Sequence, residues 1–146
     1  MIWFILIEGI KGGIYIKRIE TKNILLREFK TDDAKQAFDN WAGIKKIADL
    51  SDFKVHLSVG ETKQMIEIWL GDNEGERYTL AIIFKETEEV AGFIRIYDIS
   101  KKNRTCKIEL IVGKKWLNAG KEKSLKSVAI FYKRYYNIVT EEKIWM

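Results

Sequence analysis

Hydrophobic and polar residues follow two different periodicities along the chain, which predict a mixture of strands and helices. Residues 14–28 contain two apolar runs and predict one or two strands. Short polar segments separate three further runs that are rich in β-branched and aromatic residues, namely Tyr78–Lys85, Val90–Asp98 and Thr105–Val112. Strands joined by turns this short favour an antiparallel meander.

Three segments carry apolar residues at helical spacing. The first begins at Thr31-Asp32-Asp33, which is typical of a helix N-terminus, and runs to about Ala42. The second begins at Glu61, after the polar, turn-like stretch Asp49–Gly60, and the third is expected over Lys121–Tyr136. Their apolar faces are formed by Ala34, Ala37, Phe38 and Trp41, by Met65, Ile66, Trp69 and Leu70, and by Leu125, Val128, Ala129 and Tyr132.

The element order predicts an α/β (α+β) fold: a mixed, mostly antiparallel sheet flanked by helices. We expect one domain, since 146 residues can form one sizeable core but not two. Residues 1–14 are either a strand or a non-native leader. Their apolar run Ile2–Ile7 is far shorter than the roughly 20 residues of a membrane span, so we expect no membrane partner. Ile144–Met146 resembles the start of another strand.

Charge is distributed unevenly. The chain has 26 basic and 21 acidic residues, and residues 1–73 hold 11 of each, so the whole net charge of +5 belongs to the second half. A basic second half suggests an anionic partner such as nucleic acid, a membrane surface or a phosphorylated small molecule. The single cysteine, Cys106, excludes an internal disulfide and fits a cytoplasmic location.

The segment Cys106–Leu125 combines three features that suit phosphate binding. A predicted strand leads into a loop with glycines and lysines, and the loop leads into a helix. Helix N-termini offer unpaired amides and the positive end of a dipole, and glycine allows close backbone approach. A solvated basic turn explains the same pattern equally well.

This segment resembles the acetyl-CoA-binding segment of the GNAT superfamily of N-acetyltransferases, in the branch of the ribosomal-protein N-acetyltransferases. The residues that match that branch are Ile108, Glu109, Gly113, Lys114, Lys115, Asn118 and Gly120. Four other segments match family patterns in the same order. They are Ile19–Phe29, Thr31–Ala34, the group His56, Ser58, Glu61 and Thr62, and Val90–Ile94.

The resemblance implies that the sheet splits beside the strand that ends at Val112, and that acetyl-CoA binds in the split as co-substrate. The pantetheine arm would pair with the backbone of Glu109–Val112, and the pyrophosphate would contact the amides of Asn118–Lys123. The implied cofactor-binding residues are Leu110, Ile111, Val112, Gly113, Lys114, Asn118, Ala119, Gly120, Lys121 and Lys123. The acceptor would be a primary amine, on a protein N-terminus or a small molecule, and no metal is expected.

Glu109 is the candidate general base, because it matches a carboxylate position of the family strand and such a group can accept the amine proton. A strand carboxylate that merely faces solvent is the alternative. His56, the only histidine, could lie at a substrate loop or be structural. Cys106 could be a thiol near the site or a small buried residue.

The chain departs from the family pattern in two places that matter for function. After Gly120 it is one residue shorter, and Glu122 brings a carboxylate close to the expected pyrophosphate. It also ends where the family has its fifth strand, so we expect the last strands to be missing. An open sheet edge of this kind favours a homodimer.

Two other functions remain open at this stage. One is a truncated, degenerate acetyltransferase homologue that keeps the fold but has lost turnover. The other is a small basic nucleic-acid-binding module, which would stack bases on aromatic side chains. The candidates for such stacking are Trp116, Phe131, Tyr132, Tyr135 and Tyr136.

Overall fold

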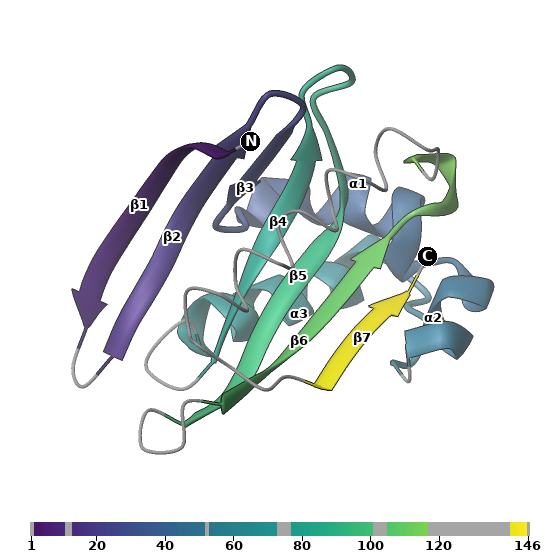
Figure 1. Cartoon of the computed structure of the whole chain (residues 1–146). Coiled ribbons are helices and arrows are strands. Elements are labelled where there is room, and N and C mark those ends of the chain that lie inside the picture. Colours follow the sequence, from purple (N-terminus) through teal and green to yellow (C-terminus); the bar gives the residue numbers. More distant parts are fainter. Residues whose placement is uncertain are drawn as a thin grey trace.

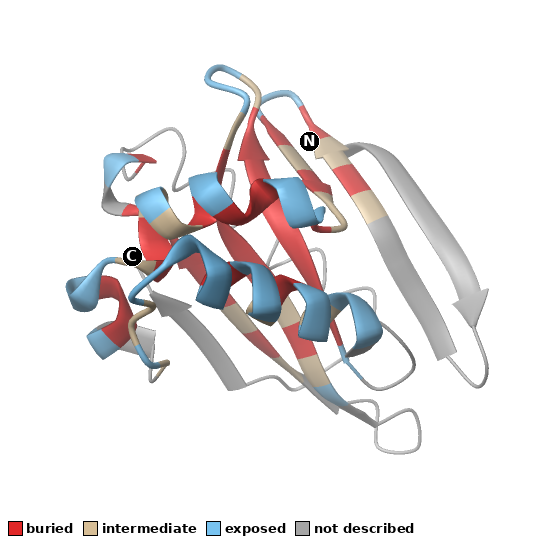
Figure 2. Ribbon diagram, turned by 180° about the vertical axis from the view of Figure 1, so that it is seen from behind, coloured by how far each residue is buried: buried red, intermediate tan, exposed pale blue. Residues whose placement is uncertain are grey.

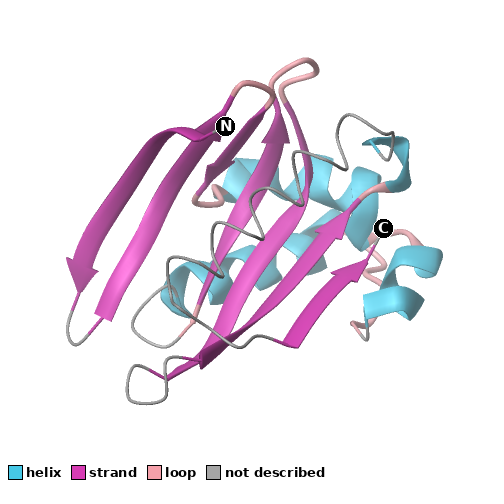
Figure 3. Ribbon diagram, in the orientation of Figure 1, coloured by secondary structure: helices cyan, strands magenta, loops and turns pink. Residues whose placement is uncertain are grey.

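One sheet forms the framework of the molecule, and the described helices lie against one of its faces (Figures 1 and 3). The computed structural model describes residues 2–10, 13–51, 53–72, 77–100, 105–116 and 141–145. In this part of the chain the sheet has seven strands, which lie side by side in chain order. The strands are β1 (Ile2–Ile10), β2 (Gly13–Thr21), β3 (Ile24–Arg27), β4 (Tyr78–Phe84), β5 (Glu89–Ser100), β6 (Thr105–Val112) and β7 (Glu141–Trp145).

The pairing confirms the predicted mixed, mostly antiparallel sheet. Neighbouring strands from β1 to β6 pair antiparallel, and β6 pairs with β7 in parallel. The three strands predicted from residue 78 onward are present, and β6 has the predicted bounds. The opening apolar run is a strand, as one of its two interpretations required.

The strand β7 corrects one expectation. We expected the partner of β6 to be missing, with only Ile144–Met146 resembling the start of a strand. Instead β7 begins at Glu141 and pairs with β6 from Lys107↔Glu141 to Ile111↔Trp145. The expectation that β6 lacks a parallel partner is therefore wrong. The helix expected over Lys121–Tyr136 lies outside the described residues.

The helical layer contains one element that the sequence pattern did not predict. Its members are η1 (Thr31–Asp33), α1 (Ala34–Ala37), η2 (Phe38–Ala42), α2 (Lys45–Ser51) and α3 (Val59–Asp72). The helix expected to end at about Ala42 does so, but its last turn η2 is a π-turn, in which the Gly43 amide donates to the Phe38 carbonyl at 2.9 Å. The stretch from Asp49 was expected to be turn-like, whereas its first residues belong to α2.

Both faces of the central strands are buried. On the helical face, aromatic and aliphatic side chains from α1, η2 and α3 pack on β4, β5 and β6, and the outer sides of the helices are exposed (Figure 2). Trp41 packs with its ring centroid 5.0 Å from that of Phe93 and 6.2 Å from that of Trp69. On the opposite face the buried side chains include Ile19, Ile24, Leu26, Leu80, Ile82, Ile94, Ile96, Ile108 and Leu110.

Candidate active site

The strand β6 carries the candidate base and the first candidate cofactor residues, and its two sides have different partners. On one side it pairs with β5, from Gly92↔Val112 to Ser100↔Thr105. On the other side the described pairing with β7 ends at Ile111↔Trp145. Val112 thus lies one residue beyond the last described pair, and no split is present along Glu109–Ile111.

Alternation along β6 assigns its residues to the two faces of the sheet. Ile111 belongs to the core that packs against the helices, so Glu109 lies on this helical face as well. Ile108, Leu110 and Val112 are buried on the other face. The side chains of the predicted cofactor residues Leu110, Ile111 and Val112 are therefore all buried, which leaves only backbone groups for a cofactor, and β7 already pairs with Leu110 and Ile111.

Glu109 belongs to a row of polar residues across the helical face. The register sets Thr79 of β4 opposite Arg95 of β5, and Arg95 opposite Glu109. On the far side of β6, Lys143 of β7 is the register partner of Glu109. Thr79 is buried, whereas Arg95 and Glu109 are half-buried. Glu109 is thus less exposed than a solvent-facing strand residue, and its cross-strand neighbour has the opposite charge, which is a stabilising arrangement.

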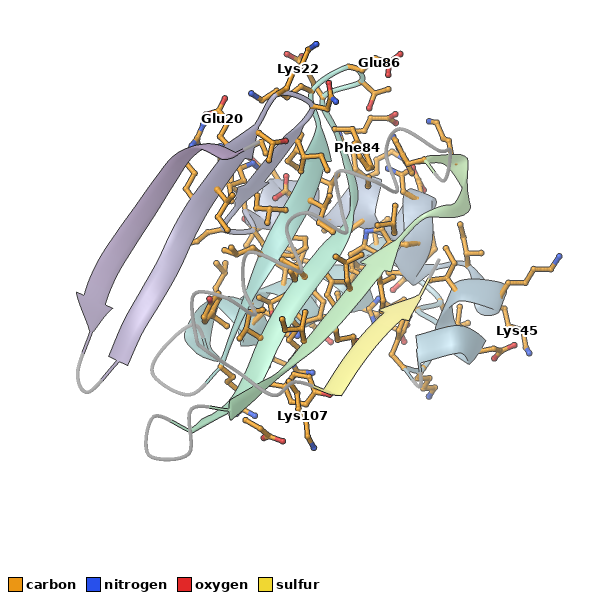
Figure 4. All side chains as sticks on the ribbon, viewed as in Figure 1. Glu20, Lys22, Lys45, Phe84, Glu86 and Lys107 are labelled. Atoms are coloured by element: carbon orange, nitrogen blue, oxygen red, sulfur yellow. The ribbon has the colours of Figure 1, made fainter. Side chains whose placement is uncertain are left out.

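A second polar group lies nearer the start of β6. The Tyr97 ring has the Arg95 guanidinium carbon 5.5 Å and the Lys107 ammonium nitrogen 6.0 Å from its centroid. Lys107 also lies 3.3 Å from the Asp98 carboxylate. Figure 4 shows Lys107 at the end of the sheet opposite to that of Lys22 and Glu86. This group therefore continues the polar row away from the end of β6 where the cofactor is expected.

The chain is tightly packed at Gly113, directly after β6, and we call this position the corner at the end of β6. The Gly113 amide donates to the Ala91 carbonyl of β5 at 2.8 Å, and the Gly113 carbonyl accepts from the Trp116 amide at 3.0 Å. A Cβ atom at Gly113 would lie 2.5 Å from the Asn40 carbonyl oxygen and 2.9 Å from the Trp116 ring. Glycine is needed here because η2 and Trp116 approach the backbone so closely.

The segment after the corner is fixed to the β4–β5 turn. Trp116, at the end of η3 (Lys114–Trp116), is only 1% exposed, and its indole nitrogen donates to the Thr87 hydroxyl at 3.4 Å. The Lys115 ammonium pairs with the Glu89 carboxylate at 3.0 Å and lies 4.8 Å from the Trp116 ring centroid. Trp116 is consequently unavailable for stacking on a nucleic-acid base.

Two amide side chains of the helical layer hold the β5 backbone next to this corner. The Val90 amide donates to the Gln36 side-chain oxygen at 2.9 Å, and the Asn40 side-chain nitrogen donates to the Val90 carbonyl at 3.0 Å. Sequence reasoning missed Gln36, Asn40 and Arg95. Nothing in their local pattern distinguishes them from ordinary polar residues, because their partners lie far away in the sequence.

His56 belongs to the cap of α3 rather than to the row around Glu109. Its Nδ1 lies 2.8 Å from the Thr62 hydroxyl, and its amide donates to the Ala42 carbonyl at 2.9 Å. Ser58 accepts from the Glu61 amide, and Glu61 accepts from the Leu57 amide. Burial lowers the pKa of His56, and the nearby Glu61 carboxylate opposes that shift. The Ser58-x-x-Glu61 spacing is a capping signal that could have identified this role from the sequence.

The remaining predicted residues are described only in part. Lys114 is described through its backbone, and Cys106 lies within β6. Asn118, Ala119, Gly120, Lys121 and Lys123 lie outside the described residues, as do Phe131, Tyr132, Tyr135 and Tyr136. Within the described ranges there is no cluster of three or more metal-ligating side chains. The described helices include none that is long and apolar enough to cross a membrane.

Comparisons with known proteins agree with the fold described above. The acetyltransferase (GNAT) domain model matches residues 23–125. A comparison with curated protein sequences finds no match. Among solved structures, a provisionally assigned ribosomal-protein-serine acetyltransferase from Vibrio cholerae has a TM-score of 0.69 at 19% identity, over 86% of this chain and 72% of its own.

Two further similar structures contain ligands. The spermidine N-acetyltransferase from Vibrio cholerae, in complex with CoA and spermine, has a TM-score of 0.61 at 14% identity, over 77% of this chain and 64% of its own. The microcin C7 self-immunity acetyltransferase, in complex with acetyl-CoA and AMP, has a TM-score of 0.61 at 17% identity, over 77% of this chain and 63% of its own. The chain thus spans less than two thirds of the length of these two structures, and at such identities the likeness concerns the fold.

Proposed function

The chain belongs to the GNAT acetyltransferase family, and on that premise we propose that it transfers the acetyl group of acetyl-CoA to a primary amine. The observation that carries the proposal is the parallel β6–β7 pair in an otherwise antiparallel sheet. In a parallel pair both strands end at the same edge of the sheet. The expected cofactor segment, which follows Val112, therefore begins beside the end of β7.

The backbone at the end of β6 fits the pantetheine arm. Because the Gly113 amide points to β5, alternation in an antiparallel ladder directs the amide and carbonyl of Val112 to the opposite side, where β7 lies. Val112 follows the last described β6–β7 pair, so we narrow the pairing site from Glu109–Val112 to Val112. Gly113 and Lys114 would lead from there to the pyrophosphate.

The pyrophosphate would be held by Asn118, Ala119, Gly120, Lys121 and Lys123, through backbone amides and positive charge. Acetyl-CoA supplies an activated thioester carbon for nucleophilic attack. The nitrogen of the amine forms a bond to that carbon, the carbon–sulfur bond breaks, and the thiolate takes up a proton. The amine loses its own proton to a base.

Glu109 is our candidate for that base. Its carboxylate lies on the helical face, two residues before Ile111, and on the strand that leads to Val112. A carboxylate there could accept the proton of the amine directly or through a water molecule. The acceptor is either a protein N-terminus or a small amine, and the spermine-bound relative makes a polyamine a suitable first substrate to assay.

The direct test is an acetyl-transfer assay that measures released CoA thiol with a panel of N-terminal peptides and polyamines. We expect turnover with wild type, and Glu109→Gln should lower kcat by about 10²-fold or more while leaving acetyl-CoA affinity unchanged. Glu20→Gln is the matched control, because Glu20 is a half-buried strand carboxylate that pairs with Lys85, away from β6. Equal kcat values for Glu109→Gln and wild type would remove Glu109 from the mechanism.

A homologue that binds acetyl-CoA without turnover is the second candidate. The sequence observation that favours it is Glu122, which brings a negative charge into the expected pyrophosphate loop. Saturable acetyl-CoA binding together with no acetyl transfer to any amine of the panel would support it. Measurable transfer in the same assay would exclude it.

We also propose self-association and a cytoplasmic location. Among the described strands β1 pairs only with β2, and its sequence contains a single charged residue, Glu8. Such an apolar edge favours pairing with the β1 of a second copy, and the single cysteine fits a reducing compartment. Light scattering should show a dimer that Ile5→Lys dissociates. A clean monomer at micromolar concentrations would contradict this.

A further inference from the structure

We propose that Asn40 is a positioning residue for the cofactor site, because it holds the end of β6 through Val90 and Ala91 of β5. The inference rests on the proposed function, since it concerns the same acetyl-CoA site. It assigns a role to a residue of the helical layer that has no place in the chemistry described above.

First, the side chains of Gln36 and Asn40 hydrogen-bond to both backbone groups of Val90. Val90 is buried, so its amide and carbonyl need hydrogen-bond partners. Two side chains from one helical segment supply them: the Gln36 oxygen accepts at 2.9 Å and the Asn40 nitrogen donates at 3.0 Å. Gln36 and Asn40 are four residues apart, which brings them to the same face of a helical turn. Together they fix both backbone groups of Val90.

The second step is a bulge in β5. The β4–β5 register shifts from Ile82↔Gly92 to Ile83↔Val90, so Ala91 has no register partner on β4. A bulge residue of this kind bends its strand and redirects the backbone groups beside it. Here the Ala91 carbonyl accepts the Gly113 amide at 2.8 Å. The hydrogen bonds that fix Val90 therefore also restrain Ala91, and through Ala91 they restrain Gly113 at the end of β6.

The third step is close contact on both sides of that corner. A Cβ atom at Gly92 would overlap the Ile111 carbonyl, and one at Gly113 would lie 2.5 Å from the Asn40 carbonyl oxygen. The main chain of Asn40 therefore lies against Gly113, and its side chain restrains Gly113 indirectly, through Val90 and Ala91 of β5. It lies in the π-turn η2, and such wide turns occur frequently at functional sites.

These contacts predict what the loss of Asn40 does. Without its side-chain nitrogen the buried Val90 carbonyl loses its partner, and the bulge that orients Ala91 loosens. The amide and carbonyl of Val112, one residue before Gly113, are then held less firmly in the orientation that would pair with the pantetheine arm. Acetyl-CoA binding should weaken, while the acceptor amine, which the proposed mechanism sets beside Glu109, should bind as before.

The test compares Asn40→Ala with Asp39→Ala, a neighbouring exposed position whose carboxylate pairs with the exposed Lys35. Calorimetry should give about a three- to tenfold weaker acetyl-CoA Kd for Asn40→Ala, and no change for the control. The KM for acetyl-CoA should rise and the KM for the amine should not. The Gly113 amide should exchange its hydrogen faster only in Asn40→Ala.

Gln36→Ala provides a second variant if Asn40→Ala does not fold, and it should shift the acetyl-CoA Kd in the same direction. An unchanged Kd in a folded variant, with wild type binding normally, overturns the inference. If wild type itself binds no acetyl-CoA, the proposed function fails and the inference fails with it. The wild-type titration distinguishes these two results.

Discussion

Arg27 and Asp33 form a bidentate ion pair that joins the end of β3 to the start of the helical layer. The Arg27 Nη1 and Nη2 atoms donate to the Asp33 Oδ2 and Oδ1 atoms at 2.8 and 3.0 Å. Asp33 Oδ2 also accepts the Lys30 amide at 2.8 Å, which fixes the first helical turn. Two of the segments that resemble the GNAT pattern, Ile19–Phe29 and Thr31–Ala34, are thus parts of one structural unit.

Removal of Asp33 should destabilise the fold strongly. The side chains of Arg27 and Asp33 are only 21% and 10% exposed, so Asp33→Ala leaves a poorly solvated guanidinium without its partner. We expect the free energy of unfolding to fall by about 2–4 kcal/mol. Urea unfolding should show this loss, and Asp39→Ala, which breaks an exposed pair, should change stability by less than about 0.5 kcal/mol. Equal effects in the two variants would contradict the assigned importance of this ion pair.

Two glycines should respond to alanine in opposite ways. At Gly113 the added methyl would press on the Asn40 carbonyl and the Trp116 ring, so Gly113→Ala should cost about 1–3 kcal/mol of stability. At Gly71, within α3, a Cβ atom meets nothing within 4 Å, and Gly71→Ala should add about 0.5–1 kcal/mol. Thermal unfolding of the two variants measures both. A neutral Gly113→Ala would show that the corner at the end of β6 is loosely packed.

Stability should depend on the protonation of His56. Its pKa in the folded chain is lowered from 6.5 by burial, so the unfolded chain takes up the proton first as the pH falls. The contribution of neutral His56 to the free energy of unfolding is therefore complete above about pH 6.5 and is lost as the pH falls below that value. Urea unfolding between about pH 8 and pH 5.5 should show the decline, and His56→Gln should abolish it. A flat wild-type profile over this range would contradict the burial of the imidazole.

The sheet could be predicted from sequence because its strands are long apolar runs between polar turns. β4 is buried at all seven positions, and β6 has the bounds that its pattern predicted. α2 was missed because it buries few apolar residues, Ile47 and Ala48 among those described, in a polar segment. The π-turn η2 was missed because its pattern of apolar residues also fits an ordinary helical turn.

The sequence could suggest candidate site residues only along β6 and the loop after it. Glu109 and Gly113 could be selected because they match a family pattern that is contiguous in sequence, and Val112 because it lies between them on the same strand. Gln36 and Asn40 could not, since their partner Val90 lies 54 and 50 residues away and is reached only in the folded chain. The resemblance also implied that Gly113 serves the cofactor, whereas the structure adds a packing reason for glycine at that position.

Titration of the chain with acetyl-CoA tests the central claim most directly. We expect saturable binding heat with one site per chain and a rise in Tm that grows with ligand concentration. Gly113→Ala should weaken this binding, and Gly71→Ala should not. No heat and no Tm shift for wild type at millimolar acetyl-CoA would contradict the claim that the end of β6 forms a cofactor site.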